Sequence, residues 1–294
     1  MKRDLSERLE SAIVESGAVK RVATPIDAWL NRRFQTTALR PLKLFLNGAW
    51  LGHPLHPVLT DIPIGAWTVT ILLDVIALLF RAPLGLAAGL AAGLGVLGAL
   101  ATAATGLMDW MDVNPPEKAV GAVHATLNTV ATILFAVSFA IRWRDQWQTT
   151  PGAFAVALVG YAFLMAGSFL GGVLVYHLGV MINRNAYRGG PEDFAPALAA
   201  AELPEREPRR VDVGGQPILL VRSGDRVFAV GAVCSHYGAP LEEGKLLGNV
   251  IQCPWHQSRF ALEDGGVREG PACAALPSYD VRVIGGRLEV RIRR

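Results

Sequence analysis

The sequence predicts a bundle of four transmembrane helices followed by a small all-β domain. Of the 294 residues, 51% are hydrophobic and 18% are charged, whereas a typical soluble domain has about 25% charged residues. The charges are also unevenly distributed: residues 51–190 carry six Lys/Arg and six Asp/Glu, and residues 191–294 carry thirteen and fourteen. This composition excludes a disordered chain, a collagen-like repeat and an ordinary soluble enzyme.

Residues 1–50 form a basic N-terminal segment with nine basic and five acidic residues. Apolar residues follow one another at helical spacing and Arg32 and Arg33 lie on the opposite face; the apolar residues are Ile26, Trp29, Leu30 and Phe34. The pattern predicts a partly amphipathic helix in the membrane interface, and a short helix packed on the domain is equally compatible with it. No run of basic residues indicates a nucleic-acid-binding surface.

Four long apolar stretches define a predicted transmembrane domain at residues 51–185. They are Leu55–Phe80, Ala82–Met108, Ala119–Ile141 and Gly152–Ile182. Each reaches the roughly 20 residues that a helix needs to cross a bilayer. In the second stretch Gly85, Gly89 and Gly93 recur at every fourth position, which lets another helix approach closely and permits a homodimer.

The basic residues near the ends of these stretches predict the orientation of the chain. With four spans both termini lie on one side, which receives Arg33, Arg40, Lys43, Lys118, Arg184 and Arg188. The other side receives Arg81, Arg142 and Arg144. Because basic residues favour the cytoplasmic side, we expect a multi-pass protein of a bacterial inner membrane, with both termini and the β domain in the cytoplasm.

Four histidines lie in or beside the predicted helices: His53, His56, His124 and His177. Because alternate helices run in opposite directions, all four lie towards the cytoplasmic side. Imidazoles from facing helices commonly hold haem or metal in a bundle, so we expect haem b or a bare metal, with His124 and His177 as the better pair because their depths are similar. A structural role is the main alternative. A quinone pocket is another, for which Asp61 and Asn128 are suggestive.

The stretch from His53 to Gly65, which begins His-Pro-Leu-His-Pro, resembles the opening of a family of predicted four-helix bacterial membrane domains of unknown function. The resemblance covers about residues 50–185. It implies a topology and no activity.

After the last apolar stretch the chain becomes polar and rich in proline and charge, which predicts a linker at residues 186–210. Short alternating or apolar runs follow, separated by glycine pairs: Ile218–Arg222, Val227–Val230, Val281–Ile284 and Leu288–Ile292. Such runs predict a small antiparallel barrel or sandwich at residues 211–294.

Two short motifs lie inside this β domain: Cys234-Ser-His236 and, 16 residues later, Cys253-Pro-Trp-His256. One Cys and one His on each of two loops are the ligands of a Rieske [2Fe–2S] centre, in which two thiolates hold one iron and two imidazoles hold the other. A structural zinc site is the rival, although zinc fingers usually group Cys with Cys and His with His.

The residues around the second motif strengthen this interpretation. Cys253-Pro-Trp-His-Gln-Ser-Arg-Phe260 and Gly270-Pro271-Ala272 resemble the second ligand loop and the proline loop of Rieske domains, over about residues 205–294. Gln257 stands where that family most often has Gly. Ala239 and Trp255 stand where Rieske proteins of respiratory complexes carry a disulfide, and Phe260 replaces a Tyr that raises their potential.

The chain therefore resembles ferredoxin-like Rieske proteins more closely than respiratory ones, with Ser258 left as a possible hydrogen-bond donor to a cluster sulfur. The resemblance implies a midpoint potential towards the lower end of about −150 to +300 mV, which a redox titration checks; a midpoint well above about +150 mV would contradict it. It also implies that His236 and His256 face a partner. Cys273, which follows the proline loop, is expected to be a small buried residue.

These observations predict a membrane-anchored one-electron carrier, whose partner is a redox protein or a quinone and whose cluster exchanges electrons with a haem or metal held by the helix histidines. A quinol-dependent oxidoreductase and a redox sensor with a membrane anchor are the alternatives. No glycine-rich loop in the sequence predicts a nucleotide or flavin site.

Overall fold

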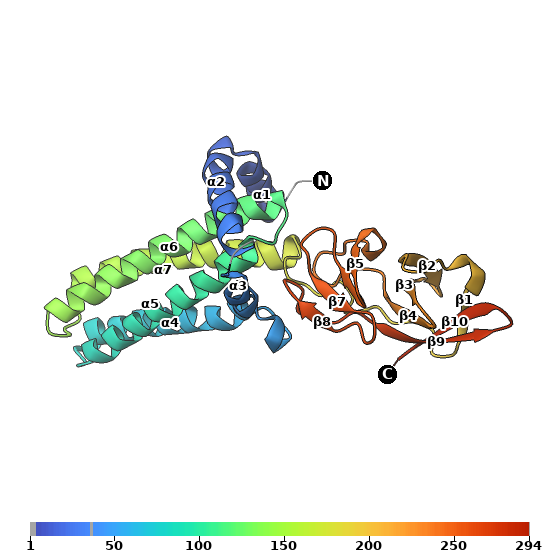
Figure 1. Cartoon of the computed structure of the whole chain (residues 1–294). Coiled ribbons are helices and arrows are strands. Elements are labelled where there is room, and N and C mark those ends of the chain that lie inside the picture. Colours follow the sequence, from blue (N-terminus) through green and yellow to red (C-terminus); the bar gives the residue numbers. More distant parts are fainter. Residues whose placement is uncertain (1–3, 36–37, 294) are drawn as a thin grey trace. The chain divides into compact units, whose positions relative to one another are not determined.

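The computed structural model describes residues 4–35 and 38–293. The chain divides into two compact units (Figure 1). The helical unit comprises residues 1–46 and 55–180, and the β unit comprises residues 47–54 and 181–294. Each unit is described by itself.

The helical unit begins with three helices: α1 Leu5–Glu15, α2 Gly17–Phe34 and α3 Arg40–Asn47. Ser16 caps α2, because its hydroxyl accepts a hydrogen bond from the Val19 amide, as N-terminal caps do. The apolar residues of the predicted amphipathic helix lie on two different faces of α2. Leu30 packs with Met108 and Met111, whereas Ile26 and Trp29 are exposed. Residues 1–3 and 36–37 of the predicted N-terminal segment lie outside the described residues.

Four long helices follow: α4 Leu55–Phe80, α5 Gly85–Trp110, α6 Pro115–Arg144 and α7 Pro151–Gly172, which continues as one π-helical turn, Val173–His177. They confirm the four predicted spans to within a few residues. All four are long and apolar enough to cross a membrane. α4 packs mainly along α5, and α6 mainly along α7 (Figure 1).

The outer surface of the bundle is apolar. Along α5 the side chains of Leu86, Leu90, Leu94, Leu97 and Leu100 point outward and are 51–68% exposed. Soluble monomers rarely expose a continuous apolar strip of this size. The strip suits contact with lipid acyl chains.

The glycines of α5 bring this helix close to aromatic side chains of the same chain. A Cβ atom on Gly89 would lie 2.6 Å from the Trp147 ring, and one on Gly93 would lie 2.8 Å from the Phe139 ring. The predicted close approach is therefore present, but the partner lies within the bundle. At these positions the glycine stripe therefore packs against residues of its own chain.

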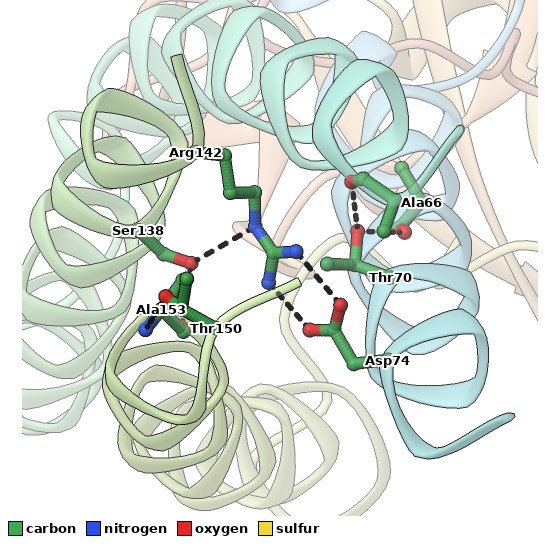
Figure 2. Close-up of polar contacts among 8 residues, drawn as sticks. Ala66, Thr70, Asp74, Ser138, Arg142, Thr150 and Ala153 are labelled. Atoms are coloured by element: carbon green, nitrogen blue, oxygen red, sulfur yellow. Dashed lines mark hydrogen bonds and ion pairs between the residues drawn. The ribbon is translucent and has the colours of Figure 1, made fainter. Parts of the chain in front are cut away.

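One buried ion pair joins α4 to α6 (Figure 2). The Arg142 guanidinium donates two hydrogen bonds to the Asp74 carboxylate, at 2.7 and 2.5 Å, and both side chains are completely buried. Arg142 also donates to the Ser138 hydroxyl at 3.3 Å, which in turn donates to the Ala153 carbonyl of α7 at 2.8 Å. The charges therefore connect three helices near one end of the bundle.

The β unit contains two antiparallel sheets among its described residues. The first has the order β1-β10-β9-β4-β3-β2 and the second the order β5-β6-β7-β8. The strands are β1 Ala195–Ala199, β2 Arg209–Val213, β3 Gln216–Ser223, β4 Arg226–Gly231, β5 Lys245–Leu247, β6 Val250–Gln252, β7 Arg259–Ala261, β8 Val267–Glu269, β9 Ser278–Ile284 and β10 Arg287–Ile292. The predicted all-β class is confirmed, and every predicted strand is present.

Two glycine pairs close two-residue hairpins of the first sheet. Gly214 and Gly215 join β2 to β3, and Gly285 and Gly286 join β9 to β10; all four have positive φ. Two central residues with positive φ define the hairpin turn whose twist matches that of its strands. The glycine pairs read from the sequence as turns are therefore required by the backbone.

The predicted linker at residues 186–210 differs from the structure. Strand β1 lies inside it and pairs with β10, and β2 begins at Arg209. The sequence of β1, Ala-Pro-Ala-Leu-Ala, lacks the β-branched and aromatic residues that favour strands. Pairing at the sheet edge, where proline is tolerated, overrides that weak local preference.

Candidate metal centre

Two loops of the β unit carry the predicted cluster ligands. The first follows β4, and the second joins β6 to β7. Each loop is closed by its own backbone: the Cys234 amide donates to the Ala239 carbonyl at 2.9 Å, and the Cys253 amide donates to the Ser258 carbonyl at 2.8 Å. Because each Cys is held at the base of a tight loop, the His two or three residues later projects from the tip of the same loop.

The two loops bring all four predicted ligands together. The His236 and His256 ring centroids lie 5.1 Å apart, with the ring planes at 88°. Both cysteines are buried, and their thiols form a hydrogen bond with each other. That bond raises the pKa of Cys234 and lowers the pKa of Cys253 to about 7.

This donor set fits a [2Fe–2S] cluster of the Rieske type. The sulfurs of Cys234 and Cys253 would hold one iron, and the imidazoles of His236 and His256 would hold the other. Cysteine binds metal as the thiolate, and the hydrogen bond with Cys234 favours that form of Cys253.

A third loop supports the two ligand loops. The Ala272 amide donates to the buried Ser258 hydroxyl at 2.9 Å, and the Ser235 hydroxyl donates to the Ala274 carbonyl at 2.6 Å. The predicted proline loop therefore packs against both ligand loops. Phe260 is fully buried in β7, where its ring offers no hydroxyl to a cluster. Cys273 is half-buried, and its thiol donates to the Pro271 carbonyl at 3.5 Å.

The exposure of the two histidines differs from the prediction. His236 is only 4% exposed and His256 is half-buried. The Tyr237 ring packs edge-on against His236 with centroids 4.7 Å apart. The outward surface next to the site is instead formed by the second loop, in which Trp255 is 52% exposed.

A small cavity of about 100 Å³ lies beside His236, and its lining includes His53, Pro54, Met181 and Cys273. Small-molecule sites usually measure about 300–1,000 Å³, so this cavity is smaller than a usual small-molecule site. His53, which the sequence placed beside the predicted helices, lies in the β unit.

Comparison with known proteins agrees with this geometry. The Rieske [2Fe–2S] domain model matches residues 193–280. The ferredoxin subunit of anthranilate 1,2-dioxygenase from Burkholderia cepacia is 32% identical over 100 residues, which are 34% of this chain and 93% of that protein. The chain belongs to the Rieske [2Fe–2S] family. The Rieske match begins at residue 193 and so includes β1, in agreement with the fold.

Two solved structures resemble the Rieske domain. The ferredoxin of carbazole 1,9a-dioxygenase from Nocardioides aromaticivorans IC177 is 30% identical and is covered to 98%, against 34% of this chain, with a TM-score of 0.33. A ferredoxin solved in complex with the oxygenase of a carbazole 1,9a-dioxygenase is 31% identical and is also covered to 98%, against 35% of this chain, with a TM-score of 0.33. Residues 52–184 match a different family, described as "Predicted membrane protein (DUF2231)".

In the helical unit of this Rieske protein, the predicted histidines pair differently from the expectation based on depth. His124 lies beside His56, with ring centroids 6.4 Å apart. His177 contacts Glu10 of α1, with its Nε2 atom 3.0 Å from the carboxylate. Depth along a helix is readable from the sequence, whereas the direction in which each side chain points depends on helix rotation.

Several residues that shape these sites do not stand out in the sequence. Tyr237 adjoins a ligand and is aromatic, a signal that was available. Gly106 and Gly171 pack against His56 and His124 respectively, and isolated glycines in an Ala/Gly-rich helix carry no distinctive signal.

Proposed function

We propose that this chain is a membrane-anchored one-electron carrier, in which the Rieske domain exchanges electrons with a soluble redox protein. The observation that carries the proposal is the meeting of Cys234, His236, Cys253 and His256 on two adjoining loops. A cluster held there supplies reversible one-electron transfer. The four apolar helices supply the anchor.

The relatives suggest the class of partner. Their names describe a ferredoxin subunit of a dioxygenase and a ferredoxin in complex with an oxygenase. By analogy, the partner of this chain is an oxygenase-like redox protein that docks on the second ligand loop. Trp255 is the natural anchor of such a contact, since exposed tryptophans are enriched among residues that dominate binding energy.

The first experiment tests the cluster and the anchor on the full chain. Purified protein should contain about two irons and two acid-labile sulfides per chain and should take up about one electron in a dithionite titration. His236→Ala should lose the cluster signal, whereas His177→Ala should keep it. The chain should also stay in the membrane fraction after alkaline washing; release into the supernatant would contradict the anchor.

The second experiment tests the docking surface. The reduced full chain is mixed with the terminal oxygenase of the Nocardioides carbazole system, and oxidation of the chain is followed by stopped-flow absorbance. Trp255→Ala should weaken the interaction by about thirtyfold, the equivalent of about 2 kcal/mol for an interface anchor. Ile284→Ala is the matched control, because Ile284 is 51% exposed on β9. Equal rates for the two variants would exclude docking at Trp255.

The orientation of the chain is part of the same proposal. A cytoplasmic Rieske domain follows from the excess of basic residues on the side of the termini. A reporter enzyme that is active only outside the cytoplasm, fused to the C-terminus, should remain inactive. Reporter activity would place the Rieske domain on the opposite side.

The finer part of the proposal concerns electron exchange inside the chain. We infer that histidines of the helical unit hold a haem or metal that shares electrons with the cluster. The sequence-based candidates are His124, His177, His53 and His56, of which His53 lies in the β unit and His177 faces Glu10. The rarity of ionisable side chains within apolar spans supports a functional role for them.

A further inference from the structure

We propose that His56 and His124 are the two axial ligands of a haem iron in the helical unit. The inference rests on the proposed electron-carrier function and names the residues of its second redox group. His56 is the second residue of α4, and His124 lies in the first half of α6. Because α4 packs mainly on α5 and α6 mainly on α7, the two imidazoles come from different helix pairs and meet between them.

The hydrogen bonds of both rings leave the metal-binding nitrogen available. The Nδ1 atom of His56 lies 2.9 Å from the Thr102 carbonyl oxygen, and that of His124 lies 2.8 Å from the Gly167 carbonyl oxygen. A carbonyl oxygen only accepts, so each Nδ1 must carry the proton and each Nε2 must carry a lone pair. Metal-bound histidines almost always donate their second ring nitrogen in this way.

The lone pairs on Nε2 need a partner. Among the residues that the structure describes, none donates a hydrogen bond to the Nε2 atom of His56 or His124. The nearby Asn128 amide donates instead to the His124 backbone carbonyl, at 2.8 Å. In a span apolar enough to cross a membrane, an acceptor without a donor costs free energy. A metal bound at Nε2 would satisfy both rings.

Glycines on the neighbouring helices leave room for both rings. A Cβ atom on Gly106 of α5 would lie 2.8 Å from His56, and one on Gly171 of α7 would lie 3.2 Å from His124. The first contact is too short for a real side chain and the second is tight. Each imidazole therefore occupies a position that a larger residue on the next helix would close.

The number and spacing of these ligands favour haem iron over a bare ion. Metal–imidazole bonds of about 2.0–2.1 Å would separate two nitrogens on opposite sides of a metal by about 4 Å, and centroids 6.4 Å apart are compatible with that span. Protein zinc sites use three or four side-chain ligands, whereas haem brings four nitrogens of its own and leaves two axial positions. His177 is not a third ligand, since its Nε2 faces Glu10.

Haem iron also suits a one-electron carrier. A ferric haem held by His56 and His124 would accept one electron from the reduced cluster, which would leave an oxidised cluster and ferrous haem. Electrons balance, no bond forms or breaks, and no proton must move.

The test is a reduced-minus-oxidised visible spectrum of the detergent-purified full chain, with the haem-to-chain ratio measured after extraction. We expect a sharp b-type band beside the broad bleaching of the cluster. Loss of a hydrogen-bond partner of a metal ligand lowers metal affinity about 10–100-fold, and loss of the ligand itself should cost at least as much. His56→Ala and His124→Ala should therefore each lower the haem-to-chain ratio at least about tenfold while the cluster bleaching persists. His177→Ala should keep the haem.

Two glycine variants distinguish a local effect at the haem from general misfolding. Gly106→Ala should shift the band or lower the haem ratio, because its Cβ collides with His56. Gly65→Ala, in the same helix as His56, should change neither, because nothing lies within 4 Å of the added Cβ. Addition of imidazole to His124→Gly should restore part of the band.

The outcomes separate the two proposals. Cluster bleaching with no haem band, or a band that survives both histidine substitutions, overturns the axial pair and leaves the carrier function intact. A bare metal that depends on both histidines and gives no haem band also overturns it. Absence of the cluster bleaching itself would instead contradict the proposed function.

Discussion

Gln257 lies between a cluster ligand and Ser258 with φ of 62°, a left-handed conformation that costs a non-glycine residue about 1–2 kcal/mol. The Rieske family most often has Gly at this place, and the backbone gives the reason. Fixing a glycine costs about 0.5–1 kcal/mol more than fixing alanine. Gln257→Gly should therefore stabilise the Rieske domain by up to about 1 kcal/mol, measured by thermal unfolding of the cluster-loaded chain.

Gly238 provides the matched control in the other ligand loop. Its φ is 80°, and the nearest atoms to an added Cβ lie at 3.9 Å. Gly238→Ala meets no steric obstacle, so only the left-handed backbone opposes it, by about 1–2 kcal/mol. Alanine recovers about 0.5–1 kcal/mol of conformational entropy, so the variant should be less stable by up to about 1 kcal/mol. Changes of the same sign for the two variants would contradict this explanation.

Tyr279 should make the stability of the β unit depend on alkaline pH. Its hydroxyl donates to the Gly189 carbonyl at 2.6 Å, and burial raises the pKa of Tyr279 to about 12, opposed by the nearby Arg188. The phenol is neutral when protonated and its pKa in the folded state exceeds the ordinary 10.0. The contribution of Tyr279 to the free energy of unfolding is therefore complete below pH 10 and is lost as pH rises through 12.

Tyr279→Phe should remove that contribution. Below pH 10 the variant should be less stable by about 1 kcal/mol for the lost hydrogen bond, and the difference should shrink between pH 10 and 12. Chemical denaturation of the two proteins across this range measures it. A difference that stays constant with pH would show that Tyr279 does not ionise on unfolding.

At the scale of elements, the Asp74–Arg142 pair should be the strongest polar constraint between helices. Asp74→Ala leaves a fully buried guanidinium without its counter-charge, and the removal of one partner of a buried pair costs about 3–5 kcal/mol. Thermal unfolding in detergent, followed by helical circular dichroism, should show this loss.

Two further variants separate the pair from its surroundings. The double variant Asp74→Leu with Arg142→Met should recover most of the stability, because apolar residues of similar volume replace both charges. Asp145→Ala, which removes the partner of the exposed Arg144, should have a far smaller effect. A double variant as unstable as Asp74→Ala would show that specific contacts of Arg142, such as that with Ser138, carry the energy.

The sequence predicts elements well where one strong physical signal determines them. Apolar runs located α4 to α7, and glycine pairs located the hairpin turns. Strand β1 was missed because its residues have weak strand preference and its partner β10 lies about 90 residues away. The four residues predicted as cluster ligands stand out in the sequence because the spacing within each loop is local, whereas the pairing of His56 with His124 depends on how two distant helices rotate.

At the scale of the whole molecule, the β unit should be separable from the helices. The match to the ferredoxin subunit of anthranilate 1,2-dioxygenase covers 100 residues of this chain and 93% of that protein, so the matched region has nearly the length of a whole protein. A fragment of residues 189–294 should be soluble and should keep its cluster, as measured by iron content and visible absorption.

A shorter fragment tests the role of β1. Residues 206–294 retain all four ligands but expose the edge of β10 that β1 covers. This fragment should unfold at a lower temperature and aggregate more readily, since an unpaired strand edge invites pairing with other chains. Equal unfolding temperatures and equal aggregation of the two fragments would show that residues 195–199 act as a linker.

The buried ion pair also has a consequence for how the chain is made. Asp74 and Arg142 are separated by 68 residues, which a ribosome adds in about 3–14 s at 5–20 residues per second. In the membrane-anchored chain proposed above, a newly inserted α4 would hold an unpaired carboxylate during that interval. Such a group costs about 2.5–3.5 kcal/mol at the centre of a membrane helix and less towards its end, where Asp74 lies. We therefore expect the Asp74 carboxylate to depend on the insertion machinery or on water for solvation until α6 brings the opposite charge.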